Sequence, residues 1–318
     1  MVKSMLTVIG MSIFLFTITG CADRQDEIQN VGMLIDSTIE EQPWGEKGLA
    51  GLTAIGDNYD VNVFYEENVM TQQDIIRAVD EFVNDGVNLI FGHSSIYGRH
   101  FAEVAKNYPN VHFVYFNGGY FADNVTSLNF NAHAMGFFAG MTAGEMTAND
   151  QVGIVAAYEW QPEIEGFYEG VSFQNPSAEV HMEIINDWND AQSAVDIYED
   201  MKNDQADVIY PTGDIFSRTI IQEASKDNLY TIGYVEDQSG IGGEMVLTST
   251  IQHVDKLYEI IADEFNNGDL NGTIKTFDFE DEIISLGEFS PHVPDDFQDN
   301  INEAVQSYKE TGLLPNES

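Results

Sequence analysis

Short apolar runs alternate with longer amphipathic segments along most of the chain. Several runs are apolar almost throughout, as strands covered on both faces must be. Between them lie segments of helical period such as 71–86, in which Ile75, Ile76, Val79 and Val83 form one face. The expected strands are 31–36, 61–66, 87–92, 111–116, 125–130, 152–157, 180–185, 207–211, 231–235 and 245–249.

This alternation of strands and helices predicts parallel sheets with right-handed crossovers and helices on both faces. Ten strands exceed one comfortable doubly wound sheet, so we expect an α/β protein with two doubly wound parallel-sheet lobes joined by a hinge. Crossings between the lobes are expected near 129–133, 249–252 and 275–284. The expected lobes are 30–130 plus 250–275 at the N-terminal side and 131–249 plus 276–318 at the C-terminal side.

The first residues have the pattern of a secretory signal. A short basic start precedes an apolar run, Met5 to Thr19, that is too short to span a membrane. The stretch ITGC ends at Cys21 and resembles the bacterial lipobox, whose cysteine receives a diacylglyceryl group before cleavage. We expect a signal peptide at 1–20 and a lipidated tether at 21–29 that holds the protein on the extracellular face of the cell membrane. An ordinary signal peptide with an incidental cysteine is the alternative.

Cys21 is the single cysteine of the 318 residues, which excludes an intramolecular disulfide and a cysteine-based zinc site. The chain also lacks the GxSxG, HExxH, P-loop and GxGxxG motifs. We therefore expect no enzyme activity, no cofactor and no metal.

The charge of the chain is strongly acidic. Twelve Lys and Arg residues stand against 54 Asp and Glu, which gives a formal net charge of −42. Such a field repels phosphate backbones and argues against binding to nucleic acid. It favours an acidic surface of the halophilic kind, because screening by salt relieves the repulsion.

Candidate ligand-binding residues follow the expected strands, where open α/β sheets bind their ligands. Indole rings there would stack on a ring, while carboxylates and amides would bind hydroxyl groups, so we expect a sugar-bearing or heteroaromatic ligand. A purely structural interpretation is that the tryptophans cover helix starts and that Asp214 caps its own helix. The candidates are Asp36, Trp44, His93, Asn117, Trp160, Asp214 and Asp237.

The order of several segments resembles a known family. VGMLID, PWGEKGLAGL, NVTSLNFNAHAMGFFAGMTAGEM, DVIYPTGD and IGYVEDQS occur in the order and spacing of the basic membrane protein family of lipoproteins, the PnrA-like substrate-binding proteins of ABC transporters. The resemblance covers nearly the whole mature chain. It implies the class I periplasmic-binding-protein fold and a purine nucleoside stacked between aromatic side chains.

The same resemblance assigns roles to three candidates. Asp36 matches the carboxylate that contacts the base, Trp44 matches a stacking aromatic, and Asp237 matches the second carboxylate of the family's GVDxDQ motif.

Three departures put nucleoside specificity in doubt. Val235 replaces an aspartate, Gln252 replaces a lysine that contacts the ribose, and Asn117 replaces a frequent aspartate. We include Gln252 among the ligand-binding candidates because of its position.

Two functions follow as expectations. The first is a lipid-anchored extracytoplasmic solute-binding protein that delivers a nucleoside or similar small molecule to an ABC permease. The alternative, suggested by a branch of the family that shares Val235 and Gln252, is a regulatory lipoprotein that promotes competence gene expression. Its ligand site would be altered or vestigial, and its partner would be a membrane regulatory protein.

High salt should stabilise the fold, because it screens the repulsion among 54 acidic residues opposed by 12 basic ones. The melting temperature should rise as sodium chloride is increased from millimolar to molar concentration. A flat or falling melting temperature would show instead that local pairing already balances the charge.

Overall fold

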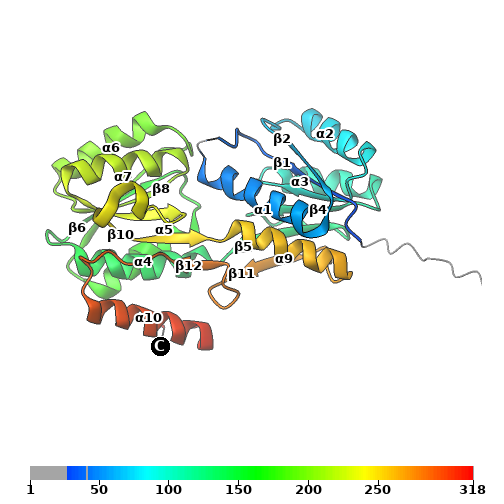
Figure 1. Ribbon diagram of the computed structural model, residues 1–318. Coiled ribbons are helices and arrows are strands. Elements are labelled where there is room, and N and C mark those ends of the chain that lie inside the picture. Colours follow the sequence, from blue (N-terminus) through cyan, green and yellow to red (C-terminus); the bar gives the residue numbers. More distant parts are fainter. Residues whose placement is uncertain (1–26, 41, 318) are drawn as a thin grey trace, which may run out of the picture.

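The computed structural model describes residues 27–40 and 42–317, so Cys21, the expected signal peptide and most of the expected tether lie outside the described residues. Figure 1 shows two lobes side by side, each built around one sheet with helices on both of its faces. This arrangement confirms the two-lobed α/β fold expected from the sequence.

The first lobe contains a six-stranded, all-parallel sheet in the order β11-β5-β4-β3-β1-β2. Its strand order reverses between β1 and β3, so the loops that follow these two strands diverge and leave room for a site. The strands are β1 (Asn30–Leu34), β2 (Asn62–Glu66), β3 (Leu89–Gly92), β4 (His112–Phe116), β5 (Val125–Phe130) and β11 (Ile274–Phe277).

The second lobe repeats this plan in the order β12-β10-β9-β8-β6-β7. Only its edge strand β12 is antiparallel, and the order reverses between β6 and β8. The strands are β6 (Gln151–Ala156), β7 (Glu179–Ile184), β8 (Val208–Thr212), β9 (Tyr230–Val235), β10 (Val246–Gln252) and β12 (Ile284–Leu286).

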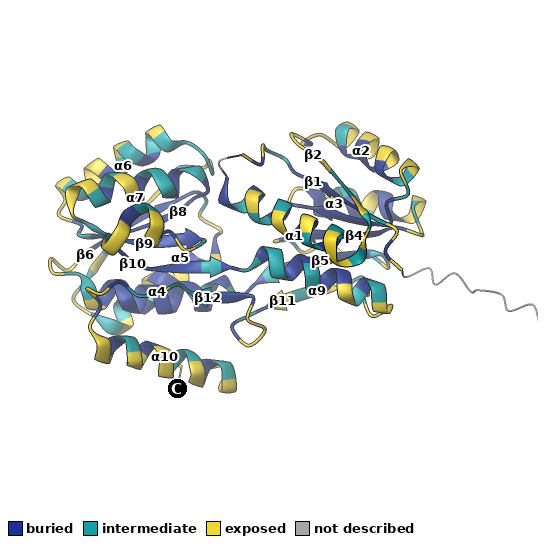
Figure 2. Ribbon diagram, viewed as in Figure 1, coloured by how far each residue is buried: buried dark blue, intermediate teal, exposed yellow. Residues whose placement is uncertain are grey.

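The helices cover both faces of each sheet (Figures 1 and 2). A continuous core joins α1 and α9 on one face of the first sheet with α4 and α5 on one face of the second. The helices are α1 (Pro43–Tyr59), α2 (Gln72–Asn84), α3 (Tyr97–Val104), α4 (Ala132–Met146), α5 (Pro162–Gln174), α6 (Ala191–Asn203), α7 (Ile215–Asp227), α8 (Ser239–Gly242), α9 (Val254–Asn267) and α10 (Asp295–Thr311), with 3-10 turns η1 (Ala105–Asn107) and η2 (Gly243–Met245).

All ten expected strands form, whereas β11 and β12 were missed. These two strands are only four and three residues long, and β11 is largely exposed, so neither produces a clear apolar run.

The chain passes between the two lobes at three places. At one of them, β11 and β12 carry the chain from the first sheet to the second. The other passages lie between β5 and α4 and between β10 and α9, and we propose the lobe boundaries at these three places.

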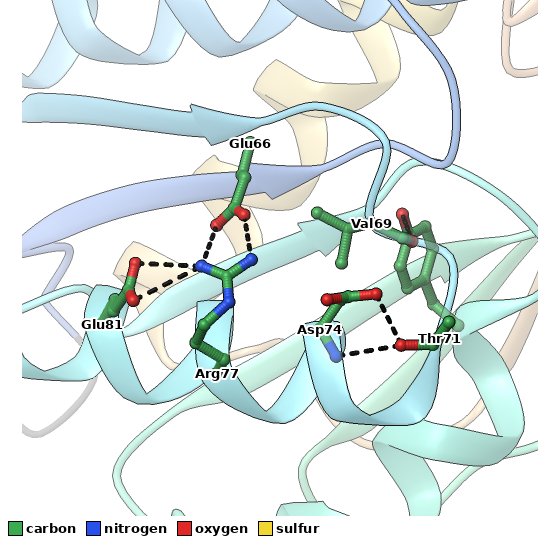
Figure 3. A network of polar contacts seen from close by, with 7 residues as sticks. Glu66, Val69, Thr71, Asp74, Arg77 and Glu81 are labelled. Carbon is green, nitrogen blue, oxygen red and sulfur yellow. Dashed lines mark hydrogen bonds and ion pairs between the residues drawn. The ribbon is translucent and has the colours of Figure 1, made fainter.

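The start of α2 shows how local chemistry fixes an expected element (Figure 3). Thr71 accepts a hydrogen bond from the Asp74 N–H and caps the helix, as its place before an amphipathic segment predicts. Further along α2, Arg77 pairs with Glu66 of β2 and with Glu81 one turn on.

The buried face of α2 differs in part from the expected one. Ile76 is 36% exposed, because the face that meets the sheet consists of Ile75, Ala78, Val79 and Phe82.

Glycines allow α4 and α5 to pack with their backbones in contact. A Cβ atom added to Gly140 of α4 would lie 2.2 Å from the carbonyl oxygen of Phe167, and one added to Gly170 of α5 would lie 1.9 Å from that of Phe137. Both distances are shorter than any van der Waals contact. The short distance between α4 and α5 is therefore possible only because both positions are glycine. In the second lobe, α4 of this pair packs against β10.

Replacing Gly140 by alanine should consequently destabilise the protein by about 1–3 kcal/mol, since the helices must move apart. Urea unfolding followed by circular dichroism measures this. Gly119→Ala is the matched control, because a Cβ atom there meets nothing within 4 Å. Equal midpoints for the two variants would contradict the close packing of α4 on α5.

Candidate ligand-binding cleft

The loops at the two reversal points of strand order face each other and form the candidate cleft. The first lobe contributes Asp36 after β1 and His93 after β3. The second contributes Trp160 after β6 and Asp214 after β8. The rule for open α/β sheets thus places these four candidates at one site.

Trp44 lies in the first turn of α1 and packs on the first lobe. Its ring stacks on His93 at a centroid distance of 4.7 Å and meets the edge of Phe116 at 5.4 Å. The indole N–H donates to the carbonyl oxygen of His93 at 3.0 Å. The ring is therefore held in one orientation at the mouth of the cleft.

His93 packs against the ring of Trp44 and is fully buried. Burial lowers the pKa of His93 to about 4, so the ring is neutral near pH 7. Its Nε2 lies 2.7 Å from the carbonyl oxygen of Trp44, which can only accept, so we assign the proton to Nε2. Nδ1 then accepts from the hydroxyl of Tyr258 at 2.9 Å. Sequence reasoning expected His93 to line the cleft, whereas its burial and filled hydrogen bonds make it a positioning residue.

Asp36 sits at the base of the cleft in the first lobe. Burial raises the pKa of its carboxyl, and hydrogen bonds from Ser94 and Ser37 oppose that rise. Its charge reaches the second lobe, because the pKa of Tyr158 is raised by burial, by Asp187 and then by Asp36. A ligand between Asp36 and Tyr158 would meet an acceptor on one side and an aromatic ring on the other.

Three aromatic rings form the opposing wall in the second lobe. Tyr158 stacks on Trp160 at 5.5 Å, and Trp188 meets both rings at 5.2 and 5.8 Å. Trp160 is 55% exposed, so one face of its ring is open for stacking. The structural interpretation of Trp160 as a mere cover for a helix start does not account for that exposure.

Asp214 makes a direct contact between the lobes. Its Oδ1 accepts from the backbone N–H of Trp44 at 3.2 Å, and only 8% of its surface is exposed. Burial raises the pKa of Asp214 to about 7; the Trp44 hydrogen bond and Arg218 act against this rise, while Glu236 and Glu46 add to it. Under the purely structural interpretation, Asp214 would cap its own helix, α7. Its side chain makes no such bond and caps the N-terminus of α1 instead.

The remaining candidates lie at the edges of the cleft. Asn117 follows β4 with φ of 56° and is exposed. Asp237 is exposed and accepts from the backbone N–H of Ser239 at 3.0 Å. Gln252 ends β10 and is buried beside β12 at the hinge. Their roles in binding stay predictions.

Sequence reasoning missed a buried polar network behind the aromatic wall. Glu163 is fully enclosed and accepts from the Tyr234 hydroxyl at 2.8 Å and from Gln161 at 3.0 Å. Gln161 also donates to the carbonyl oxygen of Thr212, which joins the ends of β6 and β8. The sequence carries no local signal for this network, because its members come from segments far apart in the chain.

Two kinds of feature are absent from residues 27–40 and 42–317. That part of the chain has no group of three or more His, Cys, Asp or Glu residues suited to a metal ion. It also has no helix long and apolar enough to cross a membrane.

The two sheets and their strand orders define a two-lobed fold of the periplasmic-binding-protein kind. A periplasmic binding protein/LacI transcriptional regulator from Alkaliphilus metalliredigens, solved with D-xylulofuranose, shares the fold with a TM-score of 0.63 at 15% identity, covering 82% of this chain and 98% of that chain. Residues 28–318 match the family described as ABC transporter substrate-binding protein PnrA-like, and the chain belongs to this Bmp family. It is a family of binding proteins and regulators, not of enzymes.

Two similar proteins are transcriptional activators. Transcriptional activator protein med of Bacillus subtilis is 46% identical over 95% of this chain and 96% of its own length. The crystal structure of a transcriptional activator of the comK gene from Bacillus halodurans has a TM-score of 0.84 at 41% identity, over 90% of this chain and 99% of that chain. A purine-binding protein of Brucella abortus is more distant, with 23% identity over 82% of this chain and 74% of its own length.

The Asp214 contact should depend on pH. Its pKa is about 7 when the lobes are in contact, whereas a free aspartate titrates near 4. A raised pKa means that the contact contributes most at low pH and that its contribution is lost as pH rises through 7.

Between pH 5 and pH 8, the free energy of unfolding of the wild type should therefore fall by about 2 kcal/mol relative to Asp214→Asn, which does not titrate there. Parallel urea titrations of the two proteins give this difference and cancel the effect of the other acidic residues. A difference that stays constant or grows with pH would contradict the burial of Asp214 between the lobes.

Proposed function

We propose that this chain is a Med-like regulatory lipoprotein that promotes competence gene expression from the outer face of the cell membrane. The observation that carries the proposal is the 46% identity to the Bacillus subtilis activator over nearly the full length of both chains. The similar Bacillus halodurans structure, described as an activator of the comK gene, points the same way.

As a regulator, this protein would act without binding DNA directly. A net charge of −42 repels the phosphate backbone, and the expected signal peptide and lipidated Cys21 would place the protein outside the cytoplasm. Its direct partner is therefore a membrane regulatory protein that reads the state of the two lobes.

The cleft retains features that suit a small ring-bearing ligand, a purine nucleoside or a similar molecule. Asp36 offers a carboxylate after β1 of the first lobe, and the indole of Trp160, which follows β6 of the second lobe, is 55% exposed. The PnrA-like family and the distant purine-binding relative support this ligand class. The replacements at Val235 and Gln252 favour an altered or weakened site.

A second candidate is transport of that ligand, because the family is one of ABC transporter substrate-binding proteins. In that case the partner would be an ABC permease, and a ligand would have to bind with useful affinity. The two candidates differ in what the protein passes on: a signal in the first case and the ligand itself in the second.

Complementation separates them. The chain, expressed in a Bacillus subtilis strain that lacks its own Med protein, should restore a fluorescent reporter driven by the comK promoter. Cys21→Ser should reduce that signal several-fold, since one thiol is expected to carry the membrane anchor. Immunoblots of membrane and medium fractions provide the control for expression.

Transport predicts the opposite pattern. The reporter would stay silent with the wild-type chain at the membrane, while purine nucleosides would raise the melting temperature of the purified protein. That combination would overturn the regulatory proposal and favour the solute receptor.

A further inference from the structure

The first turn of α1 is held by side chains of the second lobe. Asp214 accepts from the N–H of Trp44 at 3.2 Å. One turn into α7, the guanidinium of Arg218 donates to the carboxylate of Glu46 in α1 at 2.9 Å. The same guanidinium donates to Glu236, which follows β9, at 2.9 Å. Two side chains of the second lobe thus contact the first turn of α1, and Glu236 holds one of them, Arg218, in place.

The contact with Asp214 satisfies a specific need of α1. The first N–H groups of a helix lack partners within the helix, and the side chain of Gln42 at the N-cap position makes no capping bond. Such an N–H group needs an acceptor oxygen from outside the helix. Asp214 supplies that oxygen from the second lobe.

The turn that presents Glu236 is strained. Val235 has φ of 66°, a conformation that β-branched residues rarely adopt, and the N–H of Glu236 bonds to the carbonyl oxygen of Tyr234 at 2.8 Å. This is a tight three-residue turn of the rare, strained form. Strain of this kind persists only where the surrounding contacts hold it, and it is common at switch regions.

The charges around this contact are otherwise alike. Asp214, Glu46 and Glu236 all carry carboxylates, and Arg218 is the cation placed among them. Without Arg218 the closed lobes would bring these carboxylates together without compensation. The closed arrangement therefore depends on one guanidinium and one helix N-terminus.

We propose that Asp214, Arg218 and Glu236 form a latch that grips the first turn of α1 and holds the two lobes closed without a small molecule. The latch goes beyond the regulatory function proposed above and stands on the contacts alone. It gives the protein a closed form by default, so a ligand or partner acts by opening the latch or by replacing it. Whether the two lobes are closed then depends on the latch and not on ligand binding alone.

Distances between spin labels on the two lobes test the latch. Gln73 on α2 and Gln192 on α6 are exposed, and Figure 1 shows these two helices in different lobes. Both would be changed to cysteine in the full chain, with Cys21→Ser to remove the native thiol. The protein would be unfolded and refolded in mild detergent to strip any bound small molecule, and then measured by pulsed electron paramagnetic resonance.

The wild type should give one short distance. Asp214→Ala and Arg218→Gln should each raise the fraction with a longer distance at least tenfold. Two controls remove a similar group away from the cleft: Asp190→Ala removes the cap of α6, and Arg99→Gln removes an ion pair within α3. Both should keep the wild-type distance.

Two results would overturn the proposal: a mainly long distance in the stripped wild type, or unchanged distances in both latch variants. Circular dichroism confirms folding, and Arg218→Gln serves if Asp214→Ala fails to fold. Failure of the latch leaves the complementation result untouched, so this test and the test of the regulatory function give independent answers.

Discussion

The hydrogen bond from the Trp44 N–H to the Asp214 carboxylate connects the two lobes at the first turn of α1. A helix N-terminus needs acceptors, and α1 takes one from the opposite lobe. Because Trp44 is also stacked on His93, the same residue joins the first lobe's core to the second lobe's loop. Gly48 makes that stacking possible, since a Cβ atom there would lie 2.6 Å from the His93 ring.

The acidic composition makes such a contact unusual. In a chain with 54 acidic residues, two loops that approach each other bring carboxylates together and repel. The cleft offsets this repulsion by burying Asp214 against a helix N-terminus and by placing Arg218 between Glu46 and Glu236. Under the proposed latch, closure of this binding-protein fold is an internal equilibrium. A regulatory protein could use such an equilibrium as its signal.

The sequence predicts the strands well, and with them the loops that follow each strand, because both come from local patterns. Apolar runs predict strands, and the ends of those strands predict the loops that contain Asp36, His93, Trp160 and Asp214. Contacts between distant segments have no such local signal. The sequence offers α7 as the helix that Asp214 could cap, since nothing in it reveals that α1 of the other lobe comes within reach. The exposed strand β11 was missed because only its pairing with β5 makes it a strand.

Hydrogen exchange at the backbone N–H of Trp44 tests the account most directly. Residue-resolved NMR can compare this amide with that of Glu46, which bonds within the same turn to the carbonyl oxygen of Gln42. We predict that both amides are protected in the wild type and that Asp214→Ala exposes the Trp44 amide while leaving that of Glu46 protected. A Trp44 amide that already exchanges at the unprotected rate in the wild type would contradict the contact between the lobes.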